Sequence, residues 1–117
     1  MKALIFLIFL TFRPLVGTAA EPPAVQRGVA SWYGSEFSKT ASGERYDPMS
    51  MTAAHRSLPF GTIVRVKNLA TGRIATVRIN NRGPYTKGRV IDVSKAAAQQ
   101  LRMIRSGTAK VELIVVR

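Results

Sequence analysis

The chain has 117 residues, no cysteine and one histidine, and its 18 basic and 6 acidic residues give a formal net charge of +12 at pH 7. The missing cysteines exclude disulfides, thiol catalysis and cysteine-bound metals, and a single histidine excludes a histidine-rich metal centre. The sequence also lacks a phosphate-binding glycine-rich loop. We therefore expect neither a metal nor a cofactor, and a small domain that depends on close packing for its stability.

Residues 1–20 have the order of a secretory signal peptide, with Lys2, an apolar run over residues 3–12 and small residues at the end. The run of about ten residues is too short to span a bilayer, which needs roughly twenty. Arg13 and Pro14 also interrupt it. We predict export to the periplasm or cell envelope without a stable membrane anchor. Without a cysteine, the processed end cannot be acylated as in a lipoprotein.

The remaining chain is about 97 residues long, which fits one domain: a short lead at residues 21–27 and a folded part at 28–117. Removing Lys2 and Arg13 leaves 16 basic against 6 acidic residues, a formal +10. Such a field attracts polyanions, and outside the cytoplasm these are wall polymers and acidic lipids rather than nucleic acid. The alternative is that scattered cations merely keep a monomeric exported domain soluble.

The first half of the folded part predicts strands separated by one long loop. Residues 27–34 predict a strand that Gly34 ends, and residues 35–57, rich in Ser, Thr, Gly and Ala, predict the loop. Two β-branched runs, 62–67 and 74–80, flank an Asn/Thr/Gly turn, which is typical of a hairpin.

The second half predicts a strand, a helix and a strand. Residues 88–94 form the first strand, and Ser94 is a typical N-cap for a helix over residues 95–105. Residues 109–117 predict a buried closing strand. Many short strands with one short helix and no disulfide indicate an all-β, small closed barrel. In the predicted helix, Arg102 and Arg105 suit the last turn and Gly107 suits the end.

The residues able to carry chemistry are carboxylates, one imidazole and several aromatic rings. Carboxylic acids protonate glycosidic oxygens, and aromatic rings stack on the apolar faces of sugars, so this combination suggests carbohydrate cleavage. A Ser–His hydrolase would depend on the one histidine and an unplaced serine. The candidates are Glu44, Asp47, His55 and Asp92, with Trp32, Tyr33, Tyr46 and Tyr85.

Five blocks of sequence stand out: GVASWYG at 28–34, TASGERYD at 40–47, MTAAHRSLPFGTIVRVKNLATGR at 51–73, NRGPY at 81–85 and RVIDVSKAAAQQL at 89–101. They resemble the rare lipoprotein A (RlpA) family of septal-ring-type lytic transglycosylases, and the resemblance extends over residues 28–117. It implies a six-stranded double-psi β-barrel, the fold also found in expansins, with a glycan groove across one face. It also implies endolytic cleavage of peptidoglycan strands that lack stem peptides, leaving 1,6-anhydro ends.

By this resemblance the important positions are Glu44, His55 and the residue before Arg82, where the family usually has an aspartate as the leading candidate for the catalytic acid. This chain has Asn81 there. An amide can hold a sugar hydroxyl but cannot donate and recover a proton. Glu44 or Asp92 is then the candidate for the proton transfers. Trp32, Tyr33, Arg82 and Tyr85 are candidate glycan-binding residues, the aromatic ones because their rings can stack on sugar faces.

Each catalytic candidate also has a structural interpretation. Asn81 would cap the turn before Gly83, Glu44 would be a solvated loop charge, and His55 would fix the long loop. Asp92 would bind backbone amides at the helix start. Trp32 and Tyr33 alternate on their strand, so at most one of the two faces the groove.

We interpret the chain as an endolytic peptidoglycan lytic transglycosylase. The main alternative is a domain that binds or loosens the wall without cleaving it, as expansins do, because the usual acid position holds Asn81. A nucleic-acid-binding protein is the third hypothesis, and the export signal argues against it.

Overall fold

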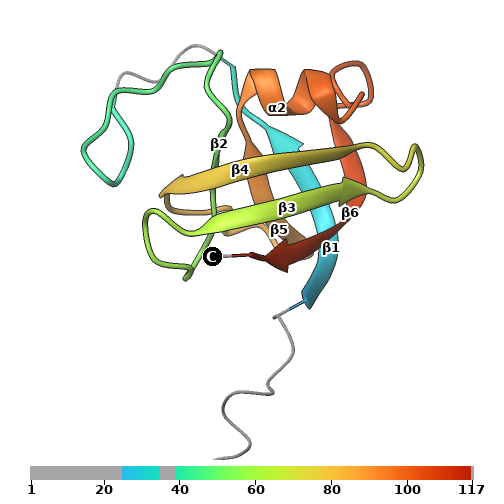
Figure 1. Cartoon of the computed structure of the whole chain (residues 1–117), viewed down its shortest axis with the longest axis horizontal. Coiled ribbons are helices and arrows are strands. Elements are labelled where there is room, and N and C mark those ends of the chain that lie inside the picture. The colour runs from blue at the N-terminus through green and yellow to red at the C-terminus, as the bar shows by residue number, and fades with distance from the viewer. Residues whose placement is uncertain (1–24, 35–38, 117) are drawn as a thin grey trace, which may run out of the picture.

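The structure, a computed structural model, describes residues 25–34 and 39–116 (Figure 1). Within these residues, six strands close into a barrel in the order β1-β5-β2-β4-β3-β6, with one short helix. The predicted fold class, an all-β six-stranded barrel with one helix, is confirmed. The predicted signal peptide at 1–20 lies outside the described residues. The elements are β1 (Val25–Trp32), β2 (Thr52–Ala54), β3 (Ile63–Asn68), β4 (Ile74–Asn81), β5 (Arg89–Val93), α2 (Lys95–Gln100) and β6 (Thr108–Val115).

Two of the strand pairs are parallel, β1 with β5 and β2 with β4, and the other four are antiparallel. The strand β1 starts at Val25, inside the segment expected as a lead, because residues 25–31 pair along their whole length with β6. Gly28 allows β1 to approach β5, since a Cβ at this position would lie 2.4 Å from Cγ1 of Val90.

The barrel interior is filled by every second side chain of the strands, as the pleat requires. In β4 the residues Ala75, Val77 and Ile79 are fully buried, as their shared face predicted. Ile91 and Val93 of β5 contribute in the same way. The outward residues of these strands are therefore free to build a polar surface, and the candidate site lies on it.

The short strand β2 lies within residues 35–57, which were predicted to be loop throughout. All three of its residues are buried, and it pairs with both β4 and β5. A Thr-Ala-Ala run has no β-branched alternation, so its strand character comes from its neighbours in the barrel. The prediction of an uninterrupted loop was wrong at this point.

The helix α2 begins as predicted and ends early. The Ser94 hydroxyl accepts a hydrogen bond from the Ala97 amide at 3.2 Å, which confirms the N-cap. The helix ends at Gln100 with Leu101 as C-cap, because Arg102 turns the chain into the left-handed region at φ 59°. Arg102 and Arg105 therefore follow the helix, and Gly107, at φ 78°, belongs to the turn before β6. In residues 25–34 and 39–116 no helix is long and apolar enough to cross a membrane.

Candidate functional site

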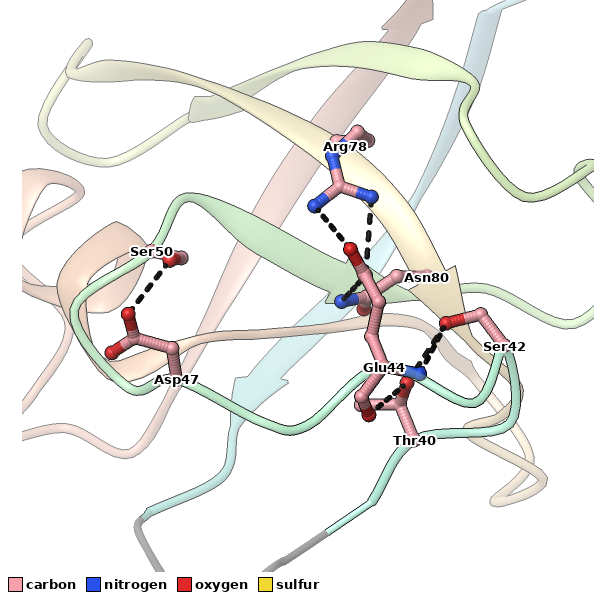
Figure 2. Close-up of polar contacts among 7 residues, drawn as sticks. All are labelled: Thr40, Ser42, Glu44, Asp47, Ser50, Arg78 and Asn80. Atoms are coloured by element: carbon pink, nitrogen blue, oxygen red, sulfur yellow. Dashed lines mark hydrogen bonds and ion pairs between the residues drawn. The ribbon is translucent and has the colours of Figure 1, made fainter.

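A carboxylate held between a loop and the outer face of β4 forms the centre of the site (Figure 2). Both oxygens of Glu44 accept hydrogen bonds from the Arg78 guanidinium, at 3.1 and 3.0 Å, and Oε1 also accepts one from Nδ2 of Asn80 at 2.8 Å. The Glu44 side chain is 45% exposed. Hydrogen bonding to Arg78 and then to Asn80 lowers the pKa of Glu44, so its charged form is favoured.

The loop that carries Glu44 is closed by its own hydrogen bonds. The Glu44 carbonyl accepts hydrogen bonds from the Thr40 amide and the Thr40 hydroxyl, at 2.8 and 2.9 Å. Gly43, at φ 95°, donates its amide to the Thr40 carbonyl at 2.9 Å. Ser42 donates its amide to the Asn80 carbonyl at 3.2 Å. The TASGE segment is therefore a tight turn fastened to the end of β4, which fixes the direction of the Glu44 side chain.

The side chain of Asn81 also holds this loop by a hydrogen bond to its backbone. Its Oδ1 accepts hydrogen bonds from the backbone amides of Ala41 and Arg82, both at 2.9 Å. The second of these bonds comes from the next residue along the chain, Arg82, so the expected cap of the turn before Gly83 stays a prediction. The first one reaches across 40 residues to the loop, a contact that the turn pattern could not reveal.

Two buried tyrosines, Tyr33 and Tyr46, pack against each other next to the loop that carries Glu44. The rings of Tyr33 and Tyr46 are 4.7 Å apart, and the Tyr46 hydroxyl donates to the Tyr33 carbonyl at 2.9 Å. Burial raises the pKa of Tyr33 to about 12, the charge of Tyr46 adds to this rise, and hydrogen bonding to the Asn81 and Thr52 side chains partly offsets it. Tyr33 is 9% exposed, so it serves the packing under the loop and presents little surface to a ligand.

Asp92 lies at the seam between β1 and β5. Its Oδ1 accepts hydrogen bonds from the Ser31 hydroxyl at 2.8 Å and from the Arg89 guanidinium at 2.7 Å. Its side chain is 20% exposed. The expectation that Asp92 binds amides at the start of α2 was wrong, because its partners are the side chains of a neighbouring strand and of its own strand. Those amides are met by Ser94 instead.

His55 is held in its neutral form by its neighbours. Its Nδ1 accepts hydrogen bonds from the amides of Ser57 and Leu58, at 3.1 and 3.2 Å, which leaves Nε2 to donate to Oε1 of Gln26 at 3.0 Å. Burial lowers the pKa of His55, and the positive charges of Arg82 and Arg56 lower it further. The side chain lines a small cavity of about 80 Å³ with Gln26 and Leu58. His55 fixes its own loop and makes no side-chain hydrogen bond to Glu44 or Asn81.

The remaining candidates for glycan contact differ in exposure. Tyr85 is 75% exposed, whereas Trp32 is partly buried against the core. Arg82 donates to the His55 carbonyl at 3.3 Å, and its guanidinium carbon lies 4.1 Å from the centre of the Phe60 ring. Arg82 is therefore held in place by an aromatic face, and Tyr85 is the more accessible ring.

The structure thus brings Glu44 and Asn81 together through one loop, and the side chains of His55 and Asp92 have other hydrogen-bond partners. The backbone of His55 does meet Asn81, because its amide donates to the Asn81 carbonyl at 3.2 Å. Sequence reasoning overlooked Arg78 and Asn80 as members of the candidate site, although they are the direct partners of Glu44. The available signal was their spacing of two residues on β4, which places both on the outward face beside the buried Ile79. A fixed, solvent-accessible carboxylate on this face can accept a proton, orient a sugar hydroxyl or stabilise positive charge.

A family model described as lytic transglycolase matches residues 25–113. The chain belongs to the RlpA family of double-psi β-barrel domains. It is 48% identical over 108 residues to the endolytic peptidoglycan transglycosylase RlpA of Campylobacter jejuni, covering 91% of this chain and 38% of that protein. It is 58% identical over 93 residues to a probable endolytic peptidoglycan transglycosylase RlpA of Nostoc sp., covering 76% and 25%. The domain thus spans less than half of these curated relatives.

Solved structures share the fold of this RlpA domain. The Streptomyces papain inhibitor superposes with a TM-score of 0.67 at 22% identity, covering 80% of this chain and 96% of that chain. An apo expansin of Clavibacter michiganensis superposes with a TM-score of 0.66 at 18% identity, covering 80% and 51%. At these identities the likeness concerns the fold alone.

Proposed function

We propose that the domain is an endolytic peptidoglycan lytic transglycosylase in which Glu44 carries out the proton transfers. Family membership and the names of the relatives support the reaction class. The observation that carries the choice of residue is the position of Glu44, 45% exposed and held by Arg78 and Asn80 on the outer face of β4. Asp92 is less exposed and lies in a different network.

The proposed reaction needs one carboxyl group. In its protonated form Glu44 donates a proton to the oxygen that bridges two amino sugars, and the bond from C1 to that oxygen breaks. The resulting carboxylate takes the proton of the C6 hydroxyl, and the C6 oxygen of the sugar forms the new bond to C1. The product carries a 1,6-anhydro ring, no water is consumed and Glu44 recovers its proton.

Arg78 sets the pH at which this cycle runs. Because its hydrogen bonds lower the pKa of Glu44, the protonated form becomes scarcer as pH rises through that pKa, and donation of the first proton becomes limiting. Bound glycan would exclude water from the carboxylate, which favours the neutral form. The proposal therefore expects faster cleavage on the acidic side of neutrality.

A second function, glycan binding without cleavage, is favoured by two observations. The residue at the usual acid position is an amide whose oxygen is engaged with two backbone amides, and the charged form of Glu44 is favoured. A surface with Arg78, Arg82 and exposed Tyr85 would still bind sugars.

The setting follows from the substrate. We propose export through residues 1–20, action in the cell envelope, and a preference for glycan strands without stem peptides. The partner is then the peptidoglycan strand itself, bound by a monomer.

The decisive experiment uses glycan strands from which the stem peptides have been removed, called stripped strands below. They are incubated with the chain, and the products are identified by mass spectrometry. Fragments with anhydro ends, lighter by one water than hydrolysis products, support the lytic reaction. Hydrolytic ends would overturn it in favour of a hydrolase. Intact strands that co-sediment with the chain would support binding alone. The Glu112→Gln variant is a matched control, because Glu112 is also bound to an arginine, Arg27, but on a different pair of strands.

A further inference from the structure

A second cavity lies on the barrel away from the Glu44 site. It has a volume of about 270 Å³ and is lined by Gln99, Arg102, Ile104 and Arg105. These residues belong to the end of α2 and to the segment that follows it, and Figure 1 shows α2. None of these residues belongs to the network of Glu44, Arg78 and Asn80. The cavity is therefore a separate feature of the surface.

Hydrogen bonds fix this cavity at the opposite end of β4. Gln100 donates to the carbonyl of Ile74, the first residue of that strand, at 3.0 Å, and Asn68 donates to the Leu101 carbonyl at 2.8 Å. Ile74 and Asn81 are seven residue steps apart along β4, which is about 23 Å at roughly 3.3 Å per step. A ligand in the cavity would not touch Glu44 unless it were long enough to run along the strand.

The backbone at Arg102 has a conformation that is uncommon for an arginine. Arg102, at φ 59°, is the one non-glycine residue with positive φ in residues 25–34 and 39–116. The residue after a helix end often takes this conformation, and glycine or asparagine adopts it with less steric cost. The chain has an arginine there, and its side chain lines the cavity.

The charge of the cavity is unbalanced within the described part of the chain. Neither Arg102 nor Arg105 takes part in the three ion pairs found there, which use Arg27, Arg78 and Arg89. The cavity lining contains no carboxylate and adds the amide of Gln99 and the aliphatic Ile104. The surface that lines the cavity is mostly apolar, so the two exposed arginines can offer their guanidinium groups at its rim. An apolar floor with guanidinium groups at its rim matches an oxyanion that has a small apolar group next to it.

We propose that this cavity binds an anionic group, a carboxylate or a phosphate, on a ligand of the cell envelope. The guanidinium groups of Arg102 and Arg105 form charge-assisted hydrogen bonds to the oxygens, and Ile104 contacts the adjoining carbon atoms. The carboxylate of a short peptide and the phosphate of a wall polymer or lipid head group offer the same chemistry, so the probes have to separate them.

A plainer account is that Arg102 and Arg105 only complement the negative end of the helix dipole. The Arg102→Gly variant separates the two accounts, because it removes one guanidinium and relieves the positive φ. The dipole account predicts a less stable protein with unchanged anion binding. Our proposal predicts a protein at least as stable as the parent that binds the anion at least tenfold more weakly.

The experiment is an NMR titration of the full chain with N-acetyl-alanine as the carboxylate probe and glycerol 3-phosphate as the phosphate probe. We expect saturable shifts of the Gln99, Arg102 and Ile104 amides, with the tighter probe identifying the source of the anion. The Arg65→Ala variant, which removes an exposed cation of β3 that forms none of those ion pairs, should bind within twofold of the parent. Equal weakening in Arg65→Ala, unchanged binding in Arg102→Gly, or shifts that do not saturate with either probe would overturn the proposal.

Discussion

Glu44 and Asp92 are both bound to an arginine on the outside of the same barrel, yet they differ in what a ligand can reach. Glu44 belongs to a loop and is 45% exposed, with partners on β4. Asp92 belongs to a strand and is 20% exposed, with partners on β1 and on its own strand. A carboxylate–arginine pair is therefore not a functional signal by itself. The carboxylate on the loop is open to a ligand, whereas the carboxylate on the strand joins two neighbouring strands.

The loop that carries Glu44 is held by the hydrogen bonds of two polar side chains at neighbouring positions of β4. Asn80 holds the carboxylate and Asn81 holds the loop backbone. The seam at Asp92 has no such loop, and its register with Ser31 is set by the parallel pairing of β1 and β5. This comparison leads to four predictions, taken from the largest expected effect to the smallest.

Replacing Glu44 with glutamine should abolish cleavage, whereas replacing Asp92 with asparagine should leave it nearly intact. Loss of a proton-transfer group typically reduces the rate about 10²- to 10⁴-fold. The measurement is the rate of release of soluble fragments from stripped glycan strands. A larger loss in Asp92→Asn than in Glu44→Gln would reverse the assignment.

Stability should show the opposite order. Replacing Asp92 with alanine leaves the part-buried Arg89 guanidinium and the Ser31 hydroxyl without their shared acceptor, which should cost about 1–3 kcal/mol. Replacing the exposed Glu44 with alanine should cost less, about 1 kcal/mol at most, because exposed ion pairs contribute little. Urea unfolding of both variants checks this order, and equal losses would contradict it.

Replacing Arg78 with methionine should extend cleavage to higher pH. Arg78 is the main cause of the lowered pKa of Glu44, so its removal raises that pKa and keeps the acid protonated further towards neutrality. We expect a gain of less than about tenfold at pH 7, because Asn80 still donates to the carboxylate and keeps part of the lowering of its pKa. The check is the pH profile of fragment release, with Arg65→Met as control, and an unshifted profile would contradict the role of Glu44.

Replacing Asn81 with aspartate should have the smallest effect, less than about tenfold in either direction. The new carboxylate would accept the same hydrogen bonds from the Ala41 and Arg82 amides, and such bonds favour its charged form. The assay is again the release of fragments from stripped strands. A gain of a hundredfold would instead identify position 81 as a lapsed acid position and remove Glu44 from that role.

Much of the barrel could be predicted because its signals are local. The β-branched runs of the hairpin, the alternation of Ala75, Val77 and Ile79, and the Ser94 cap all have physical causes within a few residues. The strand β2 was overlooked because its pairing partners are distant in sequence. The early end of α2 was overlooked because nothing in the local pattern requires a positive φ at Arg102.

The site was less predictable because its contacts are long-range. The sequence pointed to Glu44 and Asn81 as important positions, but the hydrogen bonds from Arg78 and Asn80 to Glu44 span 34 and 36 residues. His55 was weighed as a residue that orients the substrate or the acid and as a structural residue. Its ring hydrogen-bonds to Gln26 and to two loop amides, contacts that the sequence pattern does not reveal. Composition carries no information on such directions.

The most direct test of the account is to observe the side-chain carboxyl carbons of Glu44 and Asp92 by NMR while stripped glycan fragments are added. If Glu44 faces the glycan, its resonance shifts with saturation and its pKa rises as water is excluded, while the Asp92 resonance stays in place. A shift at Asp92 with none at Glu44 would contradict the account, since the carboxylate at the seam would then be the one that meets the sugar.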